Sequence, residues 1–239
     1  QFTHCQPATR PPASNICDAI GNTPLVELKS LSEVTGCRIM AKLELLNPGG
    51  SVKDRPALHM VRLAETAGLL QPGGTIVEGT GGNTGIGLVM VAKALGYNTI
   101  MCMGSHISPE KIEWMRLMGS QVVLCPSVPF GDSAHYFQTA ERLARETPGG
   151  FFTNQFENLA NSEAHFLTTG PEIWEQTGGN VDGLCLAAGT GGTIGGLSTY
   201  FKGMNPECKV YLIDPPGSGL FAFLTTGKFA AEGSSITEG

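Results

Sequence analysis

Short apolar segments alternate with longer amphipathic segments along most of the chain. The apolar segments are apolar nearly throughout, as expected of buried strands, and lie at 75–79, 98–104, 121–126, 181–189 and 208–215. The amphipathic segments have helical spacing and lie at 84–96, 108–119, 132–146, 161–179 and 193–203. Strands that are apolar on both faces and alternate with helices are typical of parallel sheets covered on both faces. The pattern therefore predicts an α/β protein with mostly parallel sheets.

Residues at the ends of these segments support the predicted boundaries. Gly96 ends the helix that precedes the strand at 98–104, and Ser108 is a candidate cap followed by Pro109, a residue favoured at the first helical position. Pro171 lies inside the predicted helix at 161–179 and is expected to kink or divide it.

Two series of strands and helices flank the segment 148–161, PGGFFTNQFENLAN, which we interpret as the junction between two doubly wound lobes. The larger lobe is predicted to comprise residues 1–56 and 154–239, and the smaller lobe residues 57–153.

Composition excludes several classes of function. The 239 residues carry 15 Lys+Arg and 21 Asp+Glu, a net charge of −6, without any basic block, which argues against nucleic acid as a partner. The hydrophobic fraction of 41% suits a soluble globular protein, no apolar run is long enough to cross a membrane, and the start does not resemble a secretory signal. We expect a cytoplasmic protein, and targeting to an organelle by a preceding segment stays open because the chain begins with Gln1.

The seven cysteines are scattered and form no C-x-x-C pair, so no metal site is expected. Several of them, such as Cys102 and Cys185, lie in apolar runs. We therefore predict buried free thiols in a reducing compartment.

Two glycine-rich loops, EGTGGNTGIG (78–87) and AAGTGGTIGG (187–196), follow predicted strands and open predicted helices. Backbone N–H groups at such positions bind phosphate or carboxylate groups. Neither loop has the G-x-G-x-x-G spacing of nicotinamide sites or the P-loop pattern. The donors Thr80, Asn83 and Thr84 suit a carboxylate, and Thr190 and Thr193 suit a phosphate. The alternative is that these residues are ordinary caps and turn residues.

Lys53 lies in NPGGSVKDRP, where Ser51 is the predicted N-cap of a helix. A helix N-terminus disfavours a cation, so a purely structural lysine would be better placed elsewhere. A lysine that must be neutral, or form an imine, is helped by this position and by burial. The alternative is a solvated lysine. Together with two anion-binding loops, Lys53 suggests a phosphorylated aldehyde cofactor that holds an amino acid.

Four motifs in this order, NPGGSVKDRPA, TGGNTGIGL, NQFENLAN and GTGGTIGG, resemble the cysteine synthase family. These are pyridoxal-phosphate enzymes of fold type II, related to cystathionine β-synthase and serine dehydratases. The resemblance runs from residues 20–28 to 214–219 and 233–239. It implies that pyridoxal 5'-phosphate binds between the lobes, with the cofactor on the larger lobe and the substrate on the smaller one.

The resemblance also implies the roles of individual residues. Lys53 corresponds to the Schiff-base lysine, which then removes the Cα proton of the amino acid, and Asn83 contacts the ring hydroxyl of the cofactor. The cofactor phosphate is bound by Gly189, Thr190, Gly191, Gly192 and Thr193. The substrate carboxylate is bound by Thr80, Gly81, Asn83, Thr84 and Gln155.

The activity implied is that of a homodimeric transferase of cysteine biosynthesis, which replaces the β-substituent of O-acetylserine or a close relative with sulfide. NQF at 154–156 resembles the sulfide-using branch, because cystathionine β-synthases tend to have tyrosine after the glutamine. Alternatives are an enzyme like cystathionine β-synthase or serine dehydratase, and a catalytically inactive regulatory homologue.

The sequence departs from the family pattern at two places. Gly81 replaces a serine, which removes a hydroxyl near the substrate. The chain stops at Glu238 and Gly239, inside a family motif EGIG. The resemblance therefore implies that the C-terminal part of the larger lobe, with the partner of the pyridine nitrogen, is missing.

Overall fold

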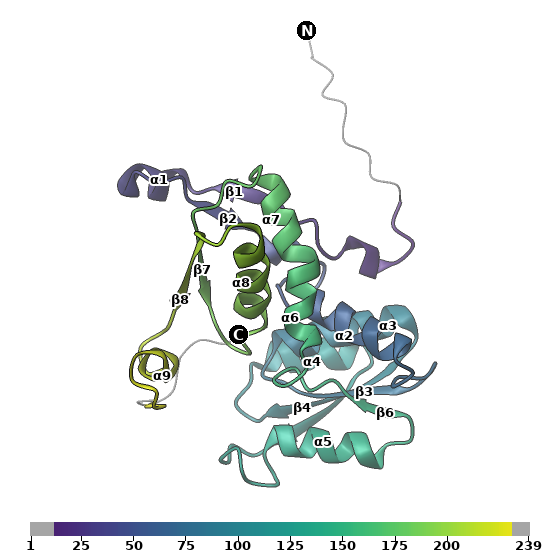
Figure 1. The fold of residues 1–239 in the computed structure, drawn as a ribbon. Coiled ribbons are helices and arrows are strands. Elements are labelled where there is room, and N and C mark those ends of the chain that lie inside the picture. Colours follow the sequence, from purple (N-terminus) through teal and green to yellow (C-terminus); the bar gives the residue numbers. More distant parts are fainter. Residues whose placement is uncertain (1–11, 231–239) are drawn as a thin grey trace.

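The computed structural model describes residues 12–230, and its largest sheet has four parallel strands in the order β5-β4-β3-β6 (Figure 1). The strands are β3 (Thr75–Gly79), β4 (Asn98–Gly104), β5 (Gln121–Cys125) and β6 (Gly150–Phe152). Thr75 pairs with both Asn98 and Gly150, which places β3 in the interior of the sheet. The predicted strands at 75–79, 98–104 and 121–126 are confirmed to within one residue.

Helices cover both faces of this sheet, as the apolar strands predicted (Figure 1). The helices are α2 (Asp54–Thr66), α3 (Asn83–Leu95), α4 (Pro109–Leu117) and α5 (Tyr136–Glu146). On β4, Met101 and Met103 belong to the core formed with α2, α3 and α4, whereas Ile100 and Cys102 pack toward α5. Alternate residues of a strand point to opposite faces, so the continuous apolar run of β4 serves two cores at once.

The rest of the described chain is built around a second pair of parallel strands, β7 (Gly183–Ala187) and β8 (Lys209–Ile213), connected by α8 (Gly192–Met204). An antiparallel pair, β1 (Leu25–Glu27) and β2 (Met40–Lys42), flanks α1 (Lys29–Thr35) and was not predicted. Short 3₁₀ helices occur at Ile16–Ala19 and Glu44–Leu46, and α9 spans Leu220–Thr226.

One face of the β7–β8 pair packs on helices and the other does not. Leu184 and Cys208 are buried against α8, where Leu197 and Phe201 complete a small core. Cys185 and Tyr211 point the other way and are exposed. The prediction of a buried thiol is therefore confirmed for Cys102 and wrong for Cys185, because within the described residues no element covers that face of β7.

The predicted helix at 161–179 forms three successive helical pieces, α6 (Ala160–Ala164), a π-helical turn (His165–Thr169) and α7 (Gly170–Gln176). The N–H of Gly170 donates to the carbonyl of His165, five residues back. The wide turn thus comes directly before Gly170 and Pro171, where proline cannot continue the ordinary hydrogen-bond ladder. Single π turns of this kind are frequent at functional sites.

Two predicted helix starts are wrong. The helix expected from residue 132 begins at Tyr136, because Asp132 caps a preceding turn and His135 accepts the N–H of Phe137. Ser51 is not the N-cap of α2, which begins at Asp54; its hydroxyl instead accepts the N–H of Lys53 within a turn.

The division into lobes stays a prediction. Helix α2 spans the predicted boundary between residues 56 and 57, and the boundary at 153 follows directly after β6. Among the described residues, no helix is both long and apolar enough to cross a bilayer.

A buried ion cluster fixes the start of α2. The guanidinium of Arg55 lies 2.6 Å from Glu44 and 2.6 Å from Glu172, and its side chain is only 2% exposed. The ammonium of Lys42 lies 2.7 Å from the second oxygen of Glu172. Burial alone would raise the pKa of Glu172, but the hydrogen bonds from Arg55 and Lys42 outweigh it and lower that pKa to about 2. The cluster therefore holds β2, α2 and α7 together through charges that stay ionised.

We expect Arg55→Met to lower the free energy of unfolding by about 3–5 kcal/mol, because the largely buried carboxylates of Glu44 and Glu172 lose the guanidinium that they share. The matched control is Arg142→Met on α5, whose partner Glu146 lies 2.7 Å away but whose side chain is 54% exposed. The control should change stability by no more than about 1 kcal/mol. Urea denaturation measures both, and equal effects of the two substitutions would contradict the central role of Arg55.

Candidate active site

Lys53 lies at the N-cap position of α2, where the helix has not yet begun. Its backbone is packed closely against α3: a Cβ at Gly87 would lie 3.1 Å from the Lys53 carbonyl oxygen. Burial lowers the pKa of the Lys53 ammonium, and the helix N-terminus also disfavours its charge. The amine is therefore predisposed to be neutral, which is the form that attacks an aldehyde.

The first glycine-rich loop connects β3 to α3, and the side chain of Thr80 forms hydrogen bonds within it. The Thr80 hydroxyl oxygen accepts the N–H groups of Gly82, at 3.1 Å, and Gly85, at 3.3 Å, and the side chain is buried. This internal role agrees with the alternative considered for Thr80, that of a turn-capping residue. The next N–H groups, of Asn83 and Thr84, belong to the first turn of α3, where no carbonyl of the helix can accept them. They are the groups that a carboxylate can reach.

Gln155 joins this loop from the segment that follows β6, as the sequence predicted. Its Oε1 accepts the hydroxyl of Thr84 at 2.5 Å, and its Nε2 donates to the Gly79 carbonyl at 3.2 Å. The structure thus brings Gln155 beside Thr84 although 71 residues separate them in the chain.

The second loop, between β7 and α8, contains Gly189 to Thr193 and has Gly191 in the left-handed region at φ +82°. No atom of the described chain lies within 4 Å of a Cβ built on Gly189 or Gly191, so there is open space beside both glycines. In contrast, a Cβ on Gly192 would clash with the amide of Asn161. A phosphate fits this arrangement, because the first turn of a 13-residue helix supplies unpaired N–H groups and the glycines leave room.

Two residues that the sequence analysis did not single out connect the parts of the site. Asn161 Nδ2 donates to the backbone carbonyl of Gln155 and to the hydroxyl of Thr190, each at 2.9 Å. Its Oδ1 is buried without a hydrogen-bond partner in the described chain. Asn161 therefore ties the residue beside the first loop to the second loop. The pattern NQFENLAN pointed to this segment but not to this contact.

His165 is the second connecting residue and lies in the π-helical turn. Its Nδ1 is 2.9 Å from the hydroxyl of Thr169, and its Nε2 is 3.3 Å from the hydroxyl of Thr193 in the second loop. Burial, followed by the nearby charges of Lys53 and Arg55, lowers the pKa of His165 to about 3. A neutral imidazole thus fixes Thr193 and adds no charge beside Lys53.

The predicted residues therefore come from four places that meet: the start of α2, the loop before α3, the segment after β6 and the loop before α8. Helix α2 packs against both α3 and α6, and α6 packs against α8. An amine prone to lose its proton, an open loop suited to phosphate and a loop suited to carboxylate together fit a phosphorylated aldehyde and an amino acid. Within the described residues, no cluster of His, Cys, Asp or Glu could hold a metal ion.

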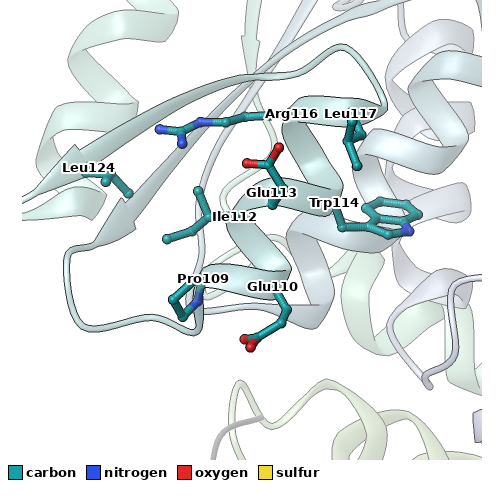
Figure 2. A pocket seen from close by; sticks show the side chains of 8 residues that line it. All are labelled: Pro109, Glu110, Ile112, Glu113, Trp114, Arg116, Leu117 and Leu124. Atoms are coloured by element: carbon teal, nitrogen blue, oxygen red, sulfur yellow. The ribbon is translucent and has the colours of Figure 1, made fainter.

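A surface hollow of about 620 Å³ lies apart from these loops, on α4 and β5 (Figure 2). It is lined by Pro109, Glu110, Ile112, Glu113, Trp114, Arg116, Leu117 and Leu124. None of the candidate site residues lines this hollow, so it is not part of the candidate site.

Comparison with known proteins identifies the family of the chain. Residues 16–236 match the family described as "Pyridoxal-phosphate dependent enzyme". Cysteine synthase 1 of Neurospora crassa is 50% identical over 230 residues, which are 95% of this chain and 61% of that protein. Cystathionine beta-synthase of Apis mellifera is 43% identical over 85% of this chain and 41% of that protein. The chain thus spans about three-fifths of the length of the curated cysteine synthase from Neurospora.

The fold is also that of a solved relative. The crystal structure of O-ureido-L-serine synthase matches with a TM-score of 0.83 and 38% identity, over 92% of this chain and 68% of that one. The sequence motifs, the geometry of the two loops around Lys53 and the family match agree, and the chain belongs to the family of pyridoxal-phosphate-dependent enzymes.

Proposed function

We propose that the protein is a cysteine synthase, which replaces the β-substituent of O-acetylserine or a similar serine derivative with sulfide. The observation that carries the proposal is the partly buried Lys53 at the start of α2, beside two glycine-rich loops that Gln155 and Asn161 join. The 50% identity to a cysteine synthase supports the same activity.

The residues of the second loop would hold pyridoxal phosphate by its phosphate group, at the N-terminus of α8, with Thr193 fixed by His165. When bound, this cofactor supplies an aldehyde for covalent attachment and a ring that withdraws electrons from the amino acid. The Nζ of Lys53 would attach the cofactor covalently and, as a free amine, would accept the proton from Cα of the substrate. Its lowered pKa favours both roles, because each needs the neutral amine.

The first loop would bind the α-carboxylate of the substrate. The hydroxyl of Thr84 is engaged by Gln155, so its contribution is the backbone N–H, together with that of Asn83. The amide of Gln155 lies beside this loop, where its Nε2 donates to Gly79, and it would also contact the carboxylate, as the family resemblance implies. Asn83, at the first position of α3, would contact the cofactor ring as well, as the same resemblance implies.

The proposed cysteine synthase activity differs from that of a cystathionine β-synthase in the nucleophile, which is sulfide in the first and a larger thiol in the second. Phe156 follows Gln155, is 45% exposed and packs edge-on against Phe137. A phenylalanine at this position favours sulfide, since it offers no hydroxyl to a larger thiol. We also propose a cytoplasmic homodimer, on the basis of the family resemblance and the free thiols.

Reduction of the purified protein with borohydride should fix the cofactor on Lys53, as peptide mapping will show. Lys53→Ala should retain the fold and lower turnover by about 10³-fold or more, because attachment and proton transfer are both lost. A label on Lys42 or Lys93 would refute the assignment, and a fully active Lys53→Ala variant would do the same.

Assays with O-acetylserine should give a kcat/KM for sulfide that exceeds the value for homocysteine by about tenfold or more. A preference for homocysteine would move the protein to the cystathionine branch. Release of pyruvate without any added thiol would indicate a dehydratase, and a bound cofactor without turnover would indicate a regulatory homologue.

Gly81→Ser tests the departure from the family motif. The nearest atom to a Cβ at this position is Ile107 Cδ1 at 3.8 Å, so the serine fits without displacement. We expect the added hydroxyl to lower KM for the amino acid by about two- to tenfold. The matched control is Gly87→Ser in helix α3, which follows this loop; there the Cβ would lie 3.1 Å from the Lys53 carbonyl oxygen, and activity should fall. An unchanged or higher KM in Gly81→Ser would show that no carboxylate lies beside residue 81.

A further inference from the structure

Glu78 is a buried carboxyl group behind the first loop that has no part in the proposed reaction. It is the penultimate residue of β3, two residues before Thr80, and its exposed fraction is 0%. Burial raises its pKa to about 7, against hydrogen bonds from Thr153 and Gln155 that lower it. Burying a carboxyl group costs free energy unless the group is hydrogen-bonded. The hydrogen bonds of Glu78 therefore indicate its role.

The two hydrogen bonds at Glu78 Oε2 go to the segment that carries Gln155. Its Oε2 accepts the hydroxyl of Thr153 at 2.5 Å and the backbone N–H of Gln155 at 3.1 Å. Its Oε1 has no hydrogen-bond partner within the described chain. The carboxyl group thus fixes the backbone at the residue whose side chain faces the loop.

Gln155 consequently forms hydrogen bonds at four atoms. Its backbone N–H donates to Glu78, and its backbone carbonyl accepts from Asn161 at 2.9 Å. In its side chain, Oε1 is bonded to Thr84 and Nε2 to Gly79. The Gly79 carbonyl can only accept a hydrogen bond, so Nε2 must face it, and the hydroxyl of Thr84 donates to Oε1. The orientation of the amide beside the first loop is thereby fixed.

We propose that Glu78 is a positioning residue for recognition of the substrate carboxylate, which it achieves by fixing Gln155 so that its amide stays beside the first loop. The inference rests on the proposed function, because the carboxylate belongs to the amino-acid substrate. Glu78 does not touch the substrate. Burial also raises the pKa of Glu78 to about 7, which reduces the negative charge behind a loop that receives an anion.

The test compares Glu78→Leu with Glu78→Gln in the protein loaded with pyridoxal phosphate. Leucine fills the space but accepts no hydrogen bond, whereas glutamine keeps an acceptor for Thr153 and Gln155. For Glu78→Leu we expect KM for O-acetylserine to rise about ten- to hundredfold, with kcat and the KM for sulfide changed less than about threefold. Glu78→Gln should stay within about threefold of the unaltered protein in all three quantities.

Two readouts do not depend on turnover. Binding of L-alanine, which has the α-carboxylate and no leaving group, is followed by cofactor absorbance and should weaken by the same factor in Glu78→Leu. Hydrogen exchange of the Gln155 amide should be slow in the unaltered protein and in Glu78→Gln, and at least about tenfold faster in Glu78→Leu. A second variant, Thr153→Val, removes one donor to Glu78 and preserves the shape of the side chain. It should raise KM for O-acetylserine about three- to tenfold and replaces Glu78→Leu in the test if that variant does not fold.

Unchanged KM and L-alanine affinity in both Glu78→Leu and Thr153→Val would overturn the proposal, as would loss in kcat alone. If the unaltered protein carries its cofactor on Lys53 yet neither binds L-alanine nor uses O-acetylserine, the proposed function has failed. Hydrogen exchange at Gln155 then decides the role of Glu78 by itself, and an equal rate in all variants would refute it.

Discussion

The candidate site depends on the burial of charge at the start of α2. Three consecutive ionisable residues lie there, and only Arg55 has partners of opposite charge, Glu44 and Glu172. Arg55 therefore stays ionised, whereas burial lowers the pKa of Lys53 and raises the pKa of Asp54 to about 6. The ion cluster fixes the helix start firmly enough for Lys53 to stay where its own charge is disfavoured. An amine with this property, placed beside two anion-binding loops, is what covalent attachment of an aldehyde cofactor requires.

The two loops act as one site because the segment after β6 connects them. Asn161 reaches from the carbonyl of Gln155 to Thr190, and His165 reaches Thr193 from the π-helical turn. These side chains are buried and their hydrogen bonds are short, so the loops cannot shift independently without leaving polar groups unpaired. These buried hydrogen bonds thus fix the position of the proposed phosphate-binding loop relative to the proposed carboxylate-binding loop.

Much of this arrangement could be predicted from the sequence, and the exceptions have physical reasons. The strands β3 and β4 were predictable because both of their faces are buried, which makes their apolar runs continuous. The edge strand β5 is apolar as well, although it is only partly buried. Lys53 and the two loops were found through glycine spacing and an unfavourable charge position. Asn161, His165 and Glu78 could not be found in this way, because their roles depend on contacts with residues far away in the chain. Ser51 misled because a serine before a helix is ambiguous: it can cap the helix or, as here, the turn that precedes it.

The central claim is that the protein holds Lys53 in an environment that favours its neutral amine. The most direct test is competitive acylation of the lysines in cofactor-free protein over a range of pH, with the extent of labelling at each lysine measured by mass spectrometry of its peptide. The midpoint for Lys53 should fall clearly below 10.5, the ordinary value for a lysine, because burial lowers its pKa. A midpoint for Lys53 at or above that value would contradict the account.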